Sequence, residues 1–202
     1  MYAKLDDKVV LKNRRKNSLV YEAGDIHKIE TIFANWEETL IWSCLQNVMG
    51  KVLVTNKENP KSACAYVGCF MFFAGEPDKE LVLNKGNGFN IMVPQNELWA
   101  RLIEECYPDS KCFTRYAIKK DTKFDVAKLK ANLSLLLSGY ELKKIDLATV
   151  CCSALILNCL EEGLYPSWDA HNMNSVHLAQ KLGYEFSHEY VAYEISVEKR
   201  TH

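Results

Sequence analysis

The sequence predicts an α/β (α+β) fold in which helices flank a mixed β-sheet, and three observations support this prediction. Of the 202 residues, 48% are hydrophobic, enough for a substantial core. Segments with apolar residues at helical spacing alternate with short extended segments along the chain. Neither an internal repeat nor a low-complexity linker interrupts this alternation. We therefore expect one compact domain or two small, closely packed ones.

The first elements are predicted from residues 25 to 75. Apolar residues recur at helical spacing from Asp25 to Met49, which predicts two helices, and Gly50 closes this pattern. A strand is then predicted at 51–55, a polar turn at 56–62, and one buried strand at 66–75.

The middle of the chain continues the alternation. Strands are predicted at 88–94 and 112–120, helices at 95–107 and 124–137, and an extended segment at 140–145. In the strand at 112–120, Phe113 and Arg115 are expected on the same side, because side chains alternate between the two faces of a sheet.

The last quarter begins with a segment, 147–163, that is apolar almost all round. This predicts a helix buried on several sides that stops at Gly163. A strand at 164–170, a helix at 172–183 and a long strand at 184–197 follow. Asn172 is placed to be the N-cap of its helix and Gly183 to be the left-handed residue that ends it. Local structure alone would explain both residues.

Charge and cysteine content limit the function classes. With 25 Lys and Arg against 26 Asp and Glu, the formal net charge is -1, so nucleic acid is not an expected partner. The basic run at 12–16 is expected to be a mobile, solvated segment. The eight cysteines lie mostly in apolar runs and are interpreted as small, reduced core residues. Neither Cys-x-x-Cys nor His-x-x-x-His occurs, so no metal site is expected.

The location of the protein is predicted from what the sequence does not contain. The first ten residues carry charges where a secretory signal needs an unbroken apolar run, and no segment is long enough to span a bilayer. We therefore expect a cytoplasmic protein that does not bind membranes.

The last quarter of the chain contains the pattern Asn-x-x-Ser-x-x-Leu-x-x-Lys-x-Gly-Tyr. This pattern and the order of the elements around it resemble the carboxy-terminal part of proteins in the GNAT superfamily of acyl-CoA-dependent N-acetyltransferases. The residues that fit the pattern are Asn172, Ser175, Leu178, Lys181, Gly183 and Tyr184. The chain looks more specifically like the zwittermicin A resistance type of this superfamily. The segments FFAGEP, IMVPQNE, TRYAIKK and YELKKID resemble the amino-terminal region of that type, so the likeness covers nearly the whole chain.

The resemblance implies a GNAT-like sheet and transfer of acetyl from acetyl-CoA, a cosubstrate, to a primary amine of a small molecule. Such proteins bind acetyl-CoA where two adjacent parallel strands splay apart, with its pyrophosphate at a helix amino terminus. The implied cofactor-binding residues are Leu147, Ala148, Thr149, Asn172, Ser175 and Lys181. His171 and Tyr184 are the candidates for proton transfer, whereas His177 is interpreted as a surface residue.

The sequence departs from the family at the pyrophosphate loop. An ungapped alignment places Asp146 at the position of the glycine in the family's pyrophosphate loop. A carboxylate at this position would repel the pyrophosphate. In the alignment we favour, the chain passes directly from the end of the amino-terminal region at Asp146 to Leu147. The early strands of the acetyltransferase domain, its catalytic strand and the phosphate loop are then missing, and Asp146 is the N-cap of the following helix. The predicted division is then 1–146, an amino-terminal α/β region, and 147–202, the carboxy-terminal part of a GNAT-like domain.

These departures keep a second function open. Besides the altered loop, Ala179 stands where many members have a tyrosine. The alternative to an acetyltransferase is a catalytically silent GNAT remnant that binds a ligand or a protein. In that case a homodimer would cover the sheet edge that the missing strands leave exposed.

Overall fold

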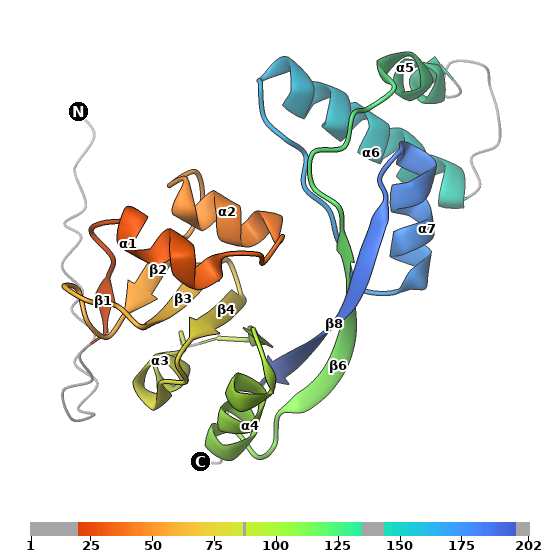
Figure 1. Cartoon of the computed structure of the whole chain (residues 1–202). Coiled ribbons are helices and arrows are strands. Elements are labelled where there is room, and N and C mark those ends of the chain that lie inside the picture. The colour runs from red at the N-terminus through yellow and green to blue at the C-terminus, as the bar shows by residue number, and fades with distance from the viewer. Residues whose placement is uncertain (1–19, 87, 135–143, 197–202) are drawn as a thin grey trace, which may run out of the picture.

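The computed structural model describes residues 20–86, 88–134 and 144–196, with the backbone alone for 144–146. Its strands form one sheet in the order β1-β2-β3-β4-β5-β8-β6-β7 (Figure 1). The strands are β1 (Tyr21–Glu22), β2 (Lys51–Val54), β3 (Ser62–Val67), β4 (Phe70–Gly75), β5 (Asn90–Pro94), β6 (Lys111–Ile118), β7 (Asp169–Ala170) and β8 (Phe186–Ile195). The basic run at 12–16 lies outside the described residues.

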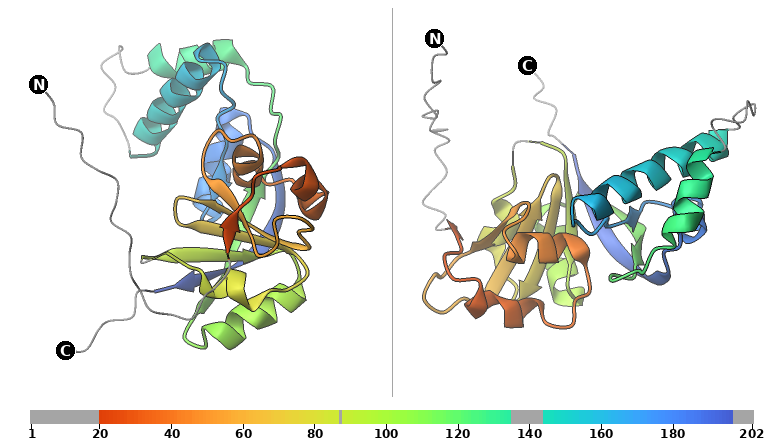
Figure 2. Two further views of the ribbon diagram at one scale, coloured as in Figure 1. Left: turned by 90° about the vertical axis from the view of Figure 1, so that its left-hand side faces the viewer. Right: turned by 90° about the horizontal axis from the view of Figure 1, so that it is seen from above.

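Helices flank this sheet, as the sequence predicted (Figure 2). They are α1 (His27–Glu30), the 3-10 helix η1 (Thr31–Phe33), α2 (Thr39–Leu45), α3 (Lys79–Leu83), α4 (Glu97–Cys106), α5 (Val126–Ser134), α6 (Lys144–Glu161) and α7 (Met173–Leu182). Among the described strands, β4 and β5 run parallel and the other neighbours run antiparallel. The mixed sheet of the predicted fold class is therefore confirmed.

Strand β8 connects the end of the chain to the middle of the sheet. It pairs with β5 from Asn90↔Ile195 to Met92↔Tyr193, and on its other side with the whole length of β6. Strands from both predicted segments, 1–146 and 147–202, thus belong to one sheet. The division between them stays a prediction.

Three apolar clusters form the core. Strand residues alternate between the first two clusters, because successive side chains point to opposite faces. Phe72 packs with η1 and α2 on one face, whereas Phe73 packs with α3 and α4 on the other. The third cluster joins α5, α6 and α7 to the end of β6, around Leu129, Leu157 and Leu182. Figure 1 shows these helices gathered at the far end of the long β6–β8 pair.

The local signals at glycine and asparagine predicted several element ends correctly. The Asn172 side chain accepts a hydrogen bond from the Ser175 backbone N–H at 3.0 Å, as an N-cap does. Gly183 ends α7 with φ 105°, and Gly163 follows α6 with φ 70°. Gly50, predicted to close the helical pattern, has φ 82° and directly precedes β2, whereas α2 already ends at Leu45.

Some predicted elements are wrong. Residues 66–75 are not one strand, because the chain reverses at Gly68, whose φ is 59°, and β3 and β4 form a hairpin. Only Asp169–Ala170 of the strand predicted at 164–170 is extended in the sheet. Of the segment predicted to be extended at 140–145, residues 140–143 lie outside the described residues and 144–145 belong to α6. Asp146 is therefore inside the first turn of α6 and not its N-cap.

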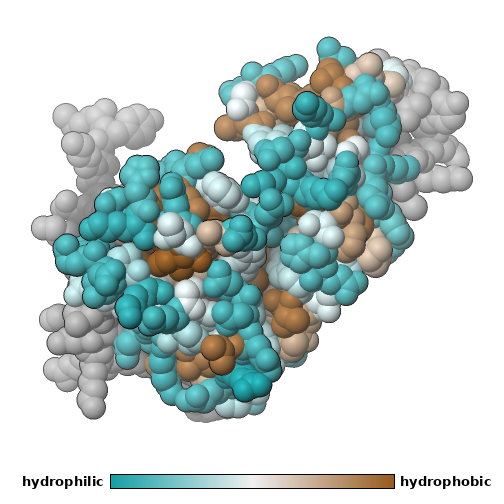
Figure 3. All heavy atoms as spheres, viewed as in Figure 1, coloured by the Kyte–Doolittle hydropathy of each residue, from teal (hydrophilic) through white to brown (hydrophobic). Residues whose placement is uncertain are grey.

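Helix α6 is less buried than its composition predicted. Leu147 and Leu155 are 47% and 62% exposed, and Figure 3 shows apolar surface over α5 and α6.

All eight cysteines are free, but only Cys44 and Cys64 are fully buried, and Cys112 and Cys151 are exposed. Cys69, Cys106 and Cys152 are partly buried and pack against the core clusters, so the interpretation as core residues holds for most cysteines and is wrong for the exposed Cys112 and Cys151. No described helix is long and apolar enough to cross a membrane.

Candidate functional site

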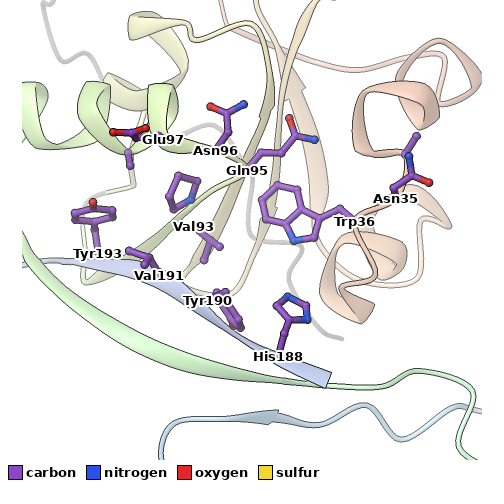
Figure 4. A pocket seen from close by; sticks show the side chains of 13 residues that line it. Asn35, Trp36, Val93, Gln95, Asn96, Glu97, His188, Tyr190, Val191 and Tyr193 are labelled. Atoms are coloured by element: carbon purple, nitrogen blue, oxygen red, sulfur yellow. The ribbon is translucent and has the colours of Figure 1, made fainter. Parts of the chain in front are cut away.

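A cleft of about 610 Å³ opens where β8 meets the junction of β5 with α4 and the turn after η1. We call it the β8 cleft. Figure 4 shows four of its side chains along β8, with Trp36 on the opposite side. Its lining residues are Ala34, Asn35, Trp36, Val93, Pro94, Gln95, Asn96, Glu97, Ala100, His188, Tyr190, Val191 and Tyr193.

The lining gives the β8 cleft an aromatic and weakly acidic character. Trp36, Tyr190 and Tyr193 supply ring faces, His188 an imidazole, and Glu97 a carboxylate whose Oε1 is paired with Arg101 Nη2 at 2.5 Å. No Lys or Arg is among the described residues that line the cleft. Ring faces and a carboxylate attract an organic cation, whereas a polyphosphate needs basic groups. The cleft therefore suits an ammonium group better than an anion.

Trp36 is fixed by its neighbours. The turn that carries it has Asn35 at φ 65°, the left-handed region that asparagine tolerates better than most residues. The Trp36 backbone N–H donates to the Phe33 carbonyl at 3.1 Å, and its ring meets Phe72 edge-on with centroids 5.9 Å apart. The indole is therefore held in place as a wall of the cleft before any ligand binds.

A buried ionic cluster lies behind Tyr190. Arg115 on β6 is 7% exposed, and its Nε donates to Asp169 Oδ2 at 2.9 Å, with Nη2 donating to the same oxygen. The Tyr190 hydroxyl donates to the other oxygen, Asp169 Oδ1, at 2.9 Å. Burial and the charge of Asp169 raise the pKa of Tyr190, so the hydroxyl keeps its proton. The cluster ties β7 to β6 and β8 and positions Tyr190.

Glu38 is a second carboxyl group near this cluster. It is 6% exposed, and its backbone N–H donates to the Trp36 carbonyl at 3.0 Å, which places it directly behind the cleft wall. Burial, and then the negative charge of Asp169, raise the pKa of Glu38 to about 7, and Arg115 offsets only part of this. Glu38 therefore exchanges a proton near neutral pH.

The structure places the two predicted proton-transfer residues differently. His171 is exposed, with Nδ1 at 3.5 Å from Arg115 Nη1 and its ring beside Phe113, so it lies at the edge of the ionic cluster. Tyr184 is only 3% exposed and donates to the Pro166 carbonyl at 2.6 Å. Burial raises its pKa, and it packs in the third core cluster. Its surroundings are those of a structural tyrosine.

The six predicted cofactor-binding residues lie on α6 and α7 or at their ends, and none of them lines the β8 cleft. Leu147 is exposed, Thr149 is buried, and Ala148 lies between these extremes. Asn172 caps α7, and the Ser175 hydroxyl accepts from Trp168 Nε1 at 3.2 Å. Lys181 and the surface residue His177 are exposed.

Burial raises the pKa of the Cys152 thiol in α6, whereas an activated cysteine has a lowered pKa.

Strand β7, next to these residues, has β6 as its only neighbour among the described strands, and this pair is antiparallel. The parallel pair, β4 and β5, stays in register from Phe70↔Ile91 to Phe73↔Pro94. Beyond it, the Gly75 N–H donates to Gln95 Oε1 at 3.0 Å, and the Gly75 carbonyl accepts from Trp99 Nε1 at 2.9 Å. Side chains thus occupy the backbone groups that a splayed pair would offer to a pantetheine arm.

Sequence reasoning missed Trp36, Glu38, Asp169 and Tyr190, because these residues come from separate elements. One signal pointed to them: Arg115 was expected on the same side of its strand as Phe113. A strand arginine beside an apolar residue needs a buried carboxylate as a partner.

Comparisons with known proteins agree with this topology. A sequence profile of the family described as GNAT acetyltransferase matches residues 30–147 and 146–193. The match divides at 146–147, where the favoured alignment passes from one part of the family to the next. The chain also resembles the crystal structure of a GCN5-related N-acetyltransferase-like protein from Streptococcus suis 89/1591, with 32% identity and a TM-score of 0.71. That likeness covers 84% of this chain and 97% of the other. No curated protein matches.

Proposed function

Because the chain belongs to the GNAT acetyltransferase family, we propose that it binds a small-molecule primary amine, the acceptor class of such enzymes, in the β8 cleft. The observation that carries this proposal is the lining of the cleft. Its described lining residues combine three aromatic rings with Glu97 and include no Lys or Arg. An ammonium group over an aromatic face gains about 0.5–2 kcal/mol, depending on how far it is desolvated.

Further carboxyl groups lie around the cleft. The Tyr193 hydroxyl donates to Glu104 Oε1 at 2.7 Å, and Glu104 lies on the same helix, α4, as Glu97. On the other side, Tyr190 rests on Asp169. Because Asp169 is paired with Arg115 and Glu97 with Arg101, the aromatic rings carry most of the preference for an alkylammonium ion.

We propose further that the protein acts as a binding module of the catalytically silent type. Two features of the described residues support this. Strand β7 has no parallel neighbour, and the Gly75 backbone groups are already bonded to Gln95 and Trp99. A pantetheine arm would have to break these bonds without an equivalent replacement, and each lost hydrogen bond costs about 1 kcal/mol.

A second candidate function is N-acetyl transfer from acetyl-CoA, of the kind the family and the zwittermicin A resistance resemblance imply. Glu38 favours it through its pKa of about 7. Because Glu38 is buried behind Trp36 and does not line the cleft, it would accept the proton of a substrate ammonium through an intervening group. The free amine would attack the thioester carbonyl, and the departing thiolate would be protonated. Leu147, Ala148, Thr149, Asn172, Ser175 and Lys181 would then bind the acetyl-CoA, and His171 or Tyr184 would supply the proton.

One pair of titrations separates the candidates. Calorimetry with n-butylamine should show saturable binding, and n-butanol, its uncharged match, should bind more weakly. Acetyl-CoA at millimolar concentration should give no saturable heat and no amine-dependent release of free thiol. Saturable acetyl-CoA binding with thiol release would establish the transferase instead. If butylamine binds no better than butanol, the amine proposal is wrong.

The other expectations from the sequence remain proposals. We propose a cytoplasmic protein and a homodimer formed through β7, because β7 is an edge of the described sheet. Light scattering over a hundredfold range of concentration checks the dimer. A mass that stays at 23.1 kDa throughout would rule it out.

A further inference from the structure

A second pocket, of about 350 Å³, adjoins the β8 cleft. We call it the Trp42 pocket. It shares Ala34, Asn35 and Trp36 with the cleft, so the turn after η1 lines both spaces. Its remaining lining residues are Glu30, Thr31, Phe33, Ile41, Trp42 and Leu45. One continuous ligand could therefore reach both pockets past this turn.

The lining of the Trp42 pocket is more apolar than that of the β8 cleft. Phe33, Ile41 and Leu45 form a buried floor, each at most 8% exposed. Trp42 is 40% exposed and stands as the outer wall. Glu30 is the one charged residue in the described lining, and neither it nor Thr31 is buried. Such a pocket gains free energy by excluding water from an apolar group and offers little to a charged one.

The walls of the Trp42 pocket are held from outside. Lys120, on the segment after β6, places Nζ 4.6 Å from the centre of the Trp42 ring. The same ammonium lies 3.8 Å from Glu37 Oε1, so its charge is paired. On the inner side, the rings of Phe33 and Trp36 are 6.4 Å apart. The two indoles are thus positioned without a ligand between them.

We propose that the Trp42 pocket is an apolar subsite of the amine site, and that the ligand is an amphipathic amine. Its ammonium group lies in the β8 cleft, and its unbranched alkyl or aryl group passes Asn35 and packs between Trp36 and Trp42. This inference rests on the proposed amine binding and adds the class of substituent. The shared turn and the more apolar lining of the Trp42 pocket support this one occupant.

The test is a chain-length series of primary amines titrated into the full chain: ethylamine, butylamine, hexylamine and octylamine. Each methylene transferred to an apolar site strengthens binding by about threefold to fourfold. The dissociation constant should therefore fall by at least about tenfold from butylamine to octylamine. Trp42→Ala opens the pocket and Thr31→Phe fills it. Each variant should abolish the decrease of the dissociation constant with chain length and leave ethylamine binding unchanged. Leu83→Ala removes an equally exposed apolar side chain on α3 and is the control.

The outcomes separate this inference from the proposed function. If octylamine binds no tighter than ethylamine, the subsite is wrong and amine binding stands. If the chain-length effect is present but survives in both folded pocket variants, the alkyl group lies elsewhere, and the subsite is again wrong. If no amine of the series binds, both the function and the subsite are overturned. Thermal melting of each variant verifies that it is folded.

Discussion

Two regions of the described sheet, its edge at β7 and its middle at β5 and β8, differ in how complete a site they form. Around β7, α6 and α7 the chain carries the motif of its family, but β7 has only an antiparallel neighbour and Tyr184 is buried in the core. Around β5 and β8 the sequence predicted no site residue, yet a cleft with a fixed aromatic wall is present. A family motif can therefore coincide with helix caps and packing, while a cleft forms in another part of the same sheet.

The Arg115–Asp169 pair joins the two regions, and breaking it should have the largest effect. Arg115→Met leaves the carboxylates of Asp169 and Glu38 buried without their cation. We expect the free energy of unfolding to fall by about 3–5 kcal/mol in urea denaturation. Arg101→Met is the matched control, because Arg101 pairs with Glu97 at 2.5 Å on an exposed surface. That change should cost about 1 kcal/mol or less, and equal losses would show that the cluster is not special.

Glu38 predicts how the cleft region responds to pH. Its pKa is about 7 when folded against an ordinary value of 4.5, so the folded state binds more protons between these values. The free energy of unfolding should therefore fall as pH rises through this window, by about 3 kcal/mol at most. Glu38→Gln should remove this loss, and Glu37→Gln, which retains Glu38, should not.

Denaturation of Glu38→Gln from pH 4 to pH 8 checks this. The stability of the variant relative to the natural chain should increase steadily above pH 4.5. If the two proteins keep a constant difference over this range, burial does not raise the pKa of Glu38 as described.

Two asparagine caps give a smaller and more direct comparison of the regions. Asn96 accepts from the Leu98 and Trp99 backbone N–H groups in α4, and Asn172 accepts from that of Ser175 in α7. Either change to alanine should cost about 1 kcal/mol of stability. Only Asn96 lines the β8 cleft, so Asn96→Ala alone should also weaken butylamine binding. Equal binding losses in the two variants would remove the distinction between the regions.

The difference between the regions also shows what the sequence could predict. Local signals located α7, α4 and most strands, because Asn172, Gly183 and the apolar spacing act within a few residues. The insertion of β8 between β5 and β6 could not be predicted, since it depends on pairing between residues far apart in the sequence, such as Met92↔Tyr193 and Lys111↔Glu194. The same holds for the site. His171 was noticed beside its motif, whereas Glu38, Arg115 and Asp169 meet only after the sheet has formed.

The central claim is that the ligand site lies in the β8 cleft and not beside β7. Calorimetric titration of butylamine into Trp36→Ala and Lys181→Ala tests this most directly. We expect Trp36→Ala to weaken binding by about tenfold, because it removes the aromatic wall, and Lys181→Ala to leave it unchanged. Unchanged binding in a folded Trp36→Ala, or a loss in Lys181→Ala, would contradict the account.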